Sequence, residues 1–224
     1  MALTLLVSKG SKNMNGFLDG FNFIFRGGFM MLPLLASSLV ALTIIIERWK
    51  AFHEQYRTPV DFVSKVLVAM QEGKVSEASH ICHVKSLPVA SVLKAGIENF
   101  KNPAEEMEIA MKNAGESWVP VLEKRIHWLD TIITIAPLMG LLGTIIGMMG
   151  SFKVLTQSGV DDPYSITGGI AEALIATATG LVVALISVIA HNYFNNQVKN
   201  SIYEMESAAS RLAEVRMASE RKKK

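Results

Sequence analysis

Three long stretches of this 224-residue chain contain no Asp, Glu, Lys or Arg: residues 29–46, 131–152 and 173–198. A helix that crosses an apolar bilayer core needs roughly 20 consecutive apolar residues, and each stretch meets or nearly meets that length. Because the chain is 50% hydrophobic yet 19% charged, its charges are concentrated between the stretches. A soluble helical bundle is the alternative, but three such runs are hard to bury in one short chain. The sequence therefore predicts an all-α membrane protein with transmembrane helices at 29–46, 131–152 and 173–191.

The basic residues are divided unequally among the segments that flank these spans. Residues 47–130 hold eleven Lys and Arg and residues 191–224 hold seven, whereas 1–28 hold three and 153–172 hold one. Segments rich in Lys and Arg near span ends stay in the cytoplasm. We therefore expect 47–130 and the tail 192–224 to be cytoplasmic, and the segment 1–28 and the short connector 153–172 to be periplasmic.

Helical patterns continue outside the spans. Thr58 and Asn102 each precede a proline and are predicted to cap helices. The helix after Asn102 is expected to run towards the membrane with few interruptions, bending at Pro120. In the tail, apolar residues at 4-3-4-3 spacing form a seam that resembles a coiled coil; they are Val198, Ile202, Met205, Ala209 and Leu212. This seam packs either within the chain, as an antiparallel pair, or between subunits.

The segment 1–28 has an apolar face opposite Asp19 and Asn22. Its members are Phe17, Phe21, Ile24 and Phe25. Such a face suits a short amphipathic helix that lies in the outer membrane–water interface. Partial disorder is the alternative for this segment.

Residues that could bind a metal or catalyse a reaction are few. Cys82 is the only cysteine, and His80 and His83 lie beside it without an evident fourth ligand. A partly buried thiol with two surface histidines is the simpler interpretation. No nucleophile–base pair and no phosphate-binding loop is evident, so we expect neither an enzyme nor a cofactor. A net charge of +2 is too small to indicate nucleic-acid binding.

The second and third predicted spans carry small residues on one face. Close approach of helix backbones through small residues is how spans associate in lipid, where no hydrophobic drive exists. In the second span Pro137 accompanies Gly140, Gly143 and Gly147. In the third span the corresponding residues are Ala173, Ala176 and Gly180. Helix packing explains these residues, but it does not explain the polar residues among them.

Those polar residues are Thr144, Glu172 and Thr177. Glu172 is either a simple interfacial acid at the outer end of its span or part of a polar cavity rimmed by the two threonines. Five residues separate Glu172 from Thr177, a rotation of about 140° on a helix, so the two need not share one wall. The chain has no acid in the middle of any span. If protons cross here, the titrating group must come from another polypeptide.

Two segments resemble the motifs of a known family. APLMGLLGTIIGMM at 136–149 and GIAEALIATATGL at 169–181 are similar to the second- and third-span motifs of the MotA/TolQ/ExbB proton-channel family, in its three-span ExbB/TolQ branch. Ile186 departs from the pattern, since many relatives have a proline there. The resemblance implies a bacterial inner-membrane homopentamer in which Thr144 and Thr177 line a pore and Glu172 is the family's third-span glutamate.

The resemblance also implies partners. Single-span proteins of the ExbD/TolR type would lie in the pore and bring a membrane aspartate. A TonB- or TolA-type protein would be driven by the proton flow. Membrane lipids would surround the ring. An ExbB-like role in outer-membrane transport is the main hypothesis. A TolQ-like role in envelope maintenance and a structural scaffold that conducts no ions are the alternatives.

Overall fold

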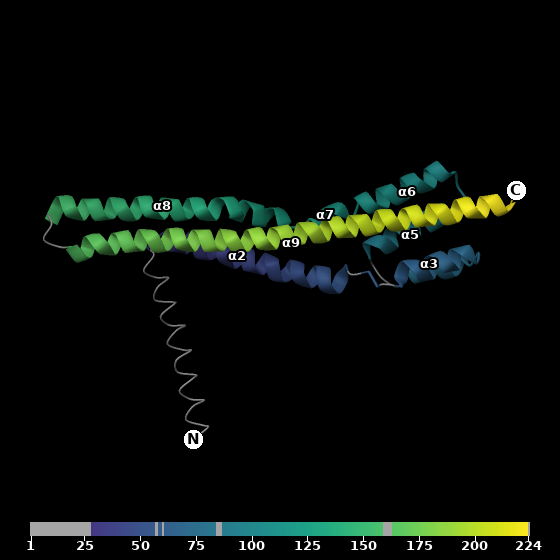
Figure 1. Cartoon of the computed structure of the whole chain (residues 1–224), viewed down its shortest axis with the longest axis horizontal. Coiled ribbons are helices and arrows are strands. Elements are labelled where there is room, and N and C mark those ends of the chain that lie inside the picture. Colours follow the sequence, from purple (N-terminus) through teal and green to yellow (C-terminus); the bar gives the residue numbers. More distant parts are fainter. Residues whose placement is uncertain (1–27, 57, 60, 84–86, 159–162, 224) are drawn as a thin grey trace, which may run out of the picture. The chain divides into compact units, whose positions relative to one another are not determined.

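The computed structural model describes residues 28–56, 58–59, 61–83, 87–158 and 163–223, and its regular structure is helical throughout these ranges (Figure 1). The predicted helix within 1–28 lies outside the described residues, apart from Gly28. Among the described residues, three helices are long and apolar enough to cross a membrane. This confirms the all-α, three-span fold. The described residues up to 43, together with those of 128–190, form one compact unit, here called the membrane unit. The described residues of 44–127 and 191–223 form a second, here called the cytoplasmic unit after the location that the basic residues lead us to expect.

The helices follow one another along the chain. They are α2 (Met31–Lys50), the π-helix η1 (Ala51–Gln55), α3 (Phe62–Gln71), α4 (Val75–His83), α5 (Pro88–Glu98), α6 (Ala104–Glu116), α7 (Val119–Leu122), α8 (Ile126–Ser158) and α9 (Pro163–Lys223). α8 and α9 each extend well beyond their apolar stretch. As a result, the second and third spans are parts of longer continuous helices.

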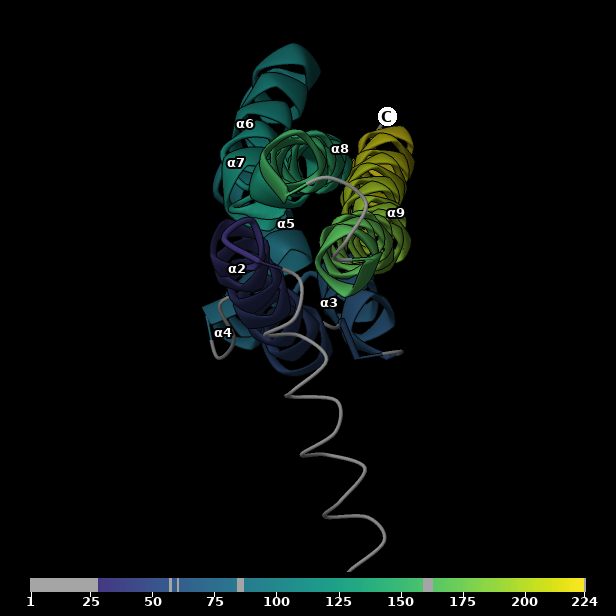
Figure 2. The same ribbon diagram turned by 90° about the vertical axis from the view of Figure 1, so that its left-hand side faces the viewer.

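In the membrane unit, α8 and α9 lie side by side (Figures 1 and 2). Large apolar side chains on both helices point outward, among them Leu138, Met149, Leu174, Leu185 and Ile189. The buried positions are held by small residues such as Ala136, Ala173 and Ala176. This inside-out distribution is the one expected of helices whose outer faces meet lipid or neighbouring spans.

In the cytoplasmic unit, the core is built from large apolar side chains. Leu93, Met107, Leu122 and Leu212 are almost completely buried. Of the predicted tail seam, Val198, Met205 and Leu212 are buried, and Ile202 and Ala209 are half-buried. Leu212 lies against Gly96 of α5, and Arg216 contacts Met107 of α6. The tail therefore packs within the chain, as the internal alternative predicts.

The helix expected to run from Asn102 towards the membrane with few interruptions has two short ones, and the bend expected at Pro120 lies elsewhere. The chain leaves helical structure after Glu116 and again after Leu122, and Pro120 lies in the first turn of the short α7 rather than at a bend. Arg125 adopts a left-handed conformation with φ of 65° directly before α8. A residue with a Cβ is strained in this conformation, so tertiary contacts must hold it there.

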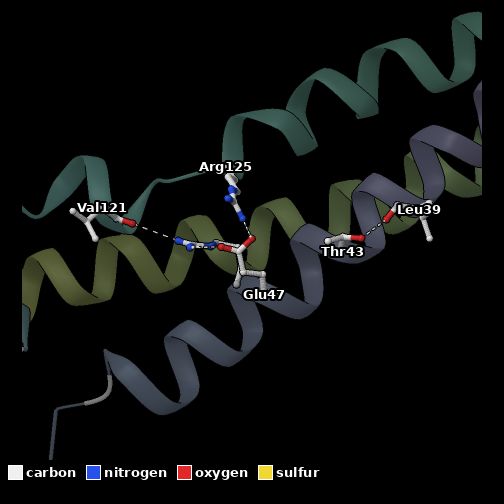
Figure 3. A network of polar contacts seen from close by, with 6 residues as sticks. Leu39, Thr43, Glu47, Val121 and Arg125 are labelled. Carbon is white, nitrogen blue, oxygen red and sulfur yellow. Dashed lines mark hydrogen bonds and ion pairs between the residues drawn. The ribbon is translucent and has the colours of Figure 1, made fainter.

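Those contacts come from the end of α2. Arg125 donates from its guanidinium to the Glu47 carboxylate (Figure 3). Arg48, whose side chain is buried, donates to the other oxygen of Glu47 at 3.3 Å and to the Val121 carbonyl at 3.4 Å. The pair Glu47–Arg48 thus binds both sides of the break between α7 and α8. Of these three side chains Arg48 is the buried one, 4% exposed against 34% for Glu47 and 49% for Arg125, so it is the charge that would be costly to leave without a partner.

The predicted caps are also displaced. α3 begins at Phe62 with Asp61 as its N-cap, and α6 begins at Ala104 with Pro103 as its N-cap. The Asn102 side chain instead donates to Asn99 at 3.0 Å, so it satisfies the preceding turn rather than the helix. Thr58 does not cap α3, because a turn closed by Phe62 N–H and the Pro59 carbonyl separates the two.

Candidate ion pathway

The site begins with a close contact between α8 and α9. A Cβ added to Gly140 would lie 3.0 Å from the Cα of Thr177, and one added to Gly147 would lie 2.9 Å from the Cβ of Ala173. Gly143 likewise meets Ala176, with 2.7 Å between such a Cβ and the alanine methyl. These distances leave no room for a larger side chain. The small residues of both motifs therefore face one another along a single seam.

The same seam continues past the proline. A Cβ on Gly180 would lie 2.5 Å from the backbone carbonyl oxygen of Ala136, the residue before Pro137. α8 remains helical through Pro137, which is half-buried. Since proline cannot donate to the preceding turn, the ladder of α8 lacks one bond here. The close approach of Gly180 to the Ala136 carbonyl thus lies next to the place where α8 lacks a backbone hydrogen bond.

Both threonines are half-buried in this region, and their hydroxyl protons are already used. Thr177 Oγ1 donates to the Gly140 carbonyl across the seam at 2.9 Å. Thr144 Oγ1 donates to the Leu141 carbonyl of its own helix at 2.6 Å. The two hydroxyls are therefore bonded to backbone rather than to each other. A hydroxyl has one proton and two lone pairs, so each oxygen can still accept but can no longer donate.

Glu172 lies elsewhere on α9. Its carboxylate packs against Gly28, where a Cβ would overlap the carboxylate oxygen. Gly28 has φ of 70°, a conformation that favours glycine, and directly precedes the turn that leads into α2. Glu172 thus faces the start of α2, whereas Thr177 faces α8. Sequence reasoning missed Gly28, because no local pattern links residues so far apart along the chain.

Two serines are also buried: Ser151 belongs to the small-residue cluster expected on the second span, whereas Ser187 was not predicted. Ser151 on α8 lies against Gly169 of α9 and donates to the Gly147 carbonyl at 3.2 Å. Ser187 on α9 is fully buried and donates to the Val183 carbonyl at 2.8 Å. Serine is polar but small, so it fits the same close packing as glycine and alanine. The helical spacing of the small residues was the signal that would have included Ser187, which follows Ala184 by three residues.

The residues considered for metal binding are not brought together. Cys82 is buried in α4, while His80 and His83 of the same helix are exposed. Burial raises the pKa of the Cys82 thiol from 9.0 to about 11, so the thiol remains protonated at neutral pH. No group of three or more His, Cys, Asp or Glu suited to a metal occurs among the described residues.

Comparisons with known proteins agree with the motifs. The family described as "MotA/TolQ/ExbB proton channel family" matches residues 84–207. The chain is 32% identical to a putative biopolymer transport protein ExbB-like 3 of Synechocystis, over 76% of this chain and 82% of the relative. It is 44% identical to the biopolymer transport protein ExbB of Salmonella typhimurium, over 75% of this chain and 72% of the relative. It is 28% identical to the Tol-Pal system protein TolQ of Pseudomonas aeruginosa, over 74% of this chain and 77% of the relative.

Proposed function

Because the chain belongs to the MotA/TolQ/ExbB proton channel family, we propose that it is the channel-forming subunit of a motor in the bacterial inner membrane. In this proposal the motor uses the proton motive force to energise outer-membrane transport through a TonB-type system. The similarity to proteins named biopolymer transport protein ExbB supports this role. The chain acts as a channel rather than as an enzyme.

The observation that carries the proposal is the state of the two threonines. Thr144 and Thr177 have committed their protons to backbone carbonyls, so each offers an incoming group only lone pairs. A protonated carboxylic acid can donate to such an oxygen, whereas a carboxylate cannot. A membrane acid from a partner is therefore held while protonated and loses the contact when its proton leaves. Each proton that passes therefore changes how strongly the partner's acid is attracted to Thr144 and Thr177.

The partner is needed because the described spans contribute no acid of their own at mid-depth. In the proposal it is an ExbD- or TolR-type protein with one span and a membrane aspartate. Five copies of the chain form the ring around it, with α8 and α9 as the wall. The N-terminus is periplasmic and the C-terminus cytoplasmic, since the basic residues flank the spans on the latter side.

Glu172 has a positioning role in this scheme. Its carboxylate packs against Gly28 at the start of α2, on a face of α9 different from that of Thr177. It thereby fixes how the first span leaves the outer surface beside the third. An acid at the rim of a span also costs less than one at the centre.

A second candidate function is a TolQ-like role in the Tol-Pal system. The 28% identity to TolQ of Pseudomonas aeruginosa extends over 74% of this chain, a coverage similar to that of the ExbB relatives. In this case the same pore would drive a TolA-type protein. Restoring TonB-dependent uptake to a strain without its own ExbB, but not envelope integrity to a strain without TolQ, would favour the first role.

The pore is tested by proton flux into liposomes that contain the chain with its aspartate-bearing partner. Thr177→Val keeps the shape but removes the lone pairs, and we expect it to abolish flux, while Thr177→Ser retains a substantial part. Thr179→Val is the matched control, since that hydroxyl bonds only to the Ile175 carbonyl of its own helix at 2.8 Å. Flux at the wild-type level in Thr177→Val would disprove the role of this residue. A subunit count other than five would disprove the ring.

A further inference from the structure

A groove lies within the cytoplasmic unit, between α6 and the last part of α9. Its volume is about 800 Å³, and α5 and α7 contribute Val92 and Val119 to its lining. On α9 the lining residues recur every three or four positions from Ile202 to Met217, so they share one face of the helix. A groove bounded by two long helix faces has the shape that receives a third helix.

The floor of the groove is apolar. Val92, Met111 and Met205 are buried in it. Ile202 and Ala209, the two half-buried members of the tail seam, also line it, so the chain covers that seam only in part. Methionine side chains are flexible and adapt to differently shaped apolar partners. The floor therefore suits apolar side chains that come from outside the chain.

The walls of the groove are acidic. Glu108 and Glu116 line it from α6, and Glu206 and Glu214 line it from α9. In each pair the two residues are eight positions apart, about 12 Å along a helix. Lys112 is the one basic residue in the lining, and it pairs with Glu116 at 3.8 Å. The other three glutamates form no ion pair within the described part of the chain, so the walls favour an occupant with positive charges.

An amphipathic helix with basic flanks matches both the floor and the walls. Its apolar residues, spaced three or four apart, form a single stripe, and long Lys and Arg side chains on either side of the stripe reach past the floor. Because the glutamates of one wall lie about 12 Å apart, each meets a different basic residue of the occupant. We propose that this groove binds a basic amphipathic helix of another protein, with the apolar stripe on Met111 and Met205 and the basic side chains beside the glutamates.

A second copy of the chain does not supply such a helix from its described residues. Outside the groove, α3, α4 and α6 each expose a single large apolar side chain, namely Val68, Val75 and Ile109. On α9 beyond residue 190, Tyr193 and Tyr203 are exposed but lie ten positions apart. None of these helices therefore has an exposed stripe with three- or four-residue spacing. The occupant is a different polypeptide, and its binding does not depend on whether the pore conducts.

The test uses the purified, intact protein in phosphatidylcholine nanodiscs and a fluorescent peptide of Leu and Lys, about 18 residues long so that it forms a helix. Leu occupies one stripe of this peptide, and binding is followed by fluorescence anisotropy, with empty nanodiscs subtracted. We expect saturable binding, and binding at least tenfold weaker for a peptide of the same composition in scrambled order and for one with Glu in place of Lys. Equal binding of all three peptides would overturn the proposal.

Matched variants locate the bound peptide. Glu206→Gln combined with Glu214→Gln should weaken binding about tenfold, since each exposed ion pair contributes a few-fold. Glu105→Gln combined with Glu106→Gln removes the same charge from exposed positions of α6 outside the groove and should leave binding unchanged. Equal weakening in the two double variants would show that the protein attracts the peptide only through its overall charge, and would refute the groove.

A photo-crosslink tests the floor and the identity of the occupant. A benzophenone group placed within the Leu stripe should attach to Met111 or Met205, as mapped by mass spectrometry of peptide fragments. Attachment confined to other helices would contradict the site. Binding that appears only after the assembly has been dissociated into single chains would mean that a second copy covers the groove, and would also overturn the proposal.

Discussion

The membrane unit and the cytoplasmic unit are both helical, but they are packed by opposite means. In the membrane unit the helices touch through glycine and alanine, so that backbone meets backbone at Gly140, Gly147 and Gly180. In the cytoplasmic unit the contacts are made by large side chains such as Leu93 and Phe194, which are almost completely buried. The same secondary structure thus supports two different kinds of interior.

The two solvents explain the difference. In water, burial of a large apolar side chain is favourable in itself, so large residues collect inside. In lipid the surroundings are as apolar as leucine, and helices gain only from close contact and from hydrogen bonds. Many large residues in the membrane-unit parts of α8 and α9 therefore lie outside, as Leu141 and Leu181 do. From this contrast, truncation should damage the cytoplasmic unit and enlargement should damage the membrane unit.

The largest effect is expected from truncating an aromatic core residue of the cytoplasmic unit. Phe194 is 1% exposed and stacks on Phe52. We expect Phe194→Ala to lower the free energy of unfolding by about 3–5 kcal/mol. The measurement is denaturant unfolding of the purified protein, followed by circular dichroism. Tyr203→Ala, at a position of α9 that is 71% exposed, should change stability by no more than about 0.5 kcal/mol. Equal losses in both variants would contradict the described core.

The next effect comes from enlarging a glycine in the membrane unit. The new methyl of Gly180→Ala would meet the Ala136 carbonyl at 2.5 Å, and backbone cannot move aside as a side chain does. We expect a loss of about 1–3 kcal/mol, measured as a lower unfolding midpoint in detergent. Gly150→Ala on α8 is the control, because no atom lies within 4 Å of its Cβ position. That variant should gain roughly 0.5–1 kcal/mol from helix propensity, and a loss there as large as that of Gly180→Ala would reject the seam.

A smaller effect is expected from the same enlargement in the cytoplasmic unit. At Gly96 a Cβ would lie 2.6 Å from Leu212 Cδ2 and from Met111 Sδ. Both atoms belong to side chains with rotatable bonds, which can rotate away. Since alanine also favours the helix, we expect Gly96→Ala to change stability by less than about 1 kcal/mol. If Gly96→Ala is as damaging as Gly180→Ala under the same unfolding assay, the contrast between side-chain and backbone packing fails.

The smallest effect on stability at neutral pH concerns Cys82, which is buried among apolar residues in the cytoplasmic unit. The unfolded thiol ionises near 9.0, whereas burial keeps the folded thiol protonated up to about 11. The folded state therefore binds more protons between these values. Its contribution to stability is complete below about pH 9 and is lost as pH rises towards 11. Iodoacetamide should label the native thiol far more slowly than the urea-unfolded thiol at pH 8, and equal rates would show that Cys82 is accessible.

The sequence was sufficient for the spans and for the faces of α8 and α9. Charge-free length fixes the spans, and the helical spacing of Gly140, Gly143 and Gly147 fixes which side of α8 meets its neighbour. The contact of Glu172 with Gly28 was not predictable, because the two residues lie far apart along the chain and no local rule pairs them. The hydrogen bond from Thr177 to the Gly140 carbonyl was likewise not predictable. Every residue has a backbone carbonyl, so the sequence does not show which one accepts.

The break between α7 and α8 was missed for a related reason. Arg125 has ordinary helix propensity, so nothing local predicts its left-handed conformation. The conformation is held by the carboxylate of Glu47, which lies far away in the sequence. The displaced cap at Asn102 has a local cause instead: its side chain donates to Asn99 in the preceding turn, and a propensity rule cannot choose between that turn and the start of α6.

The backbone contacts at Gly140, Gly147 and Gly180 also determine how stiff the wall is. Sliding of packed helices normally proceeds through small side-chain rotations that let each surface reshape. Glycine has no side-chain rotamers, and a carbonyl that is hydrogen-bonded within its helix cannot turn away. The seam therefore has no side chain that could rotate to let the helices slide. The two helices must therefore move as one body or remain still. In the proposed motor, such a wall is the stator, and the motion belongs to the chain that it surrounds.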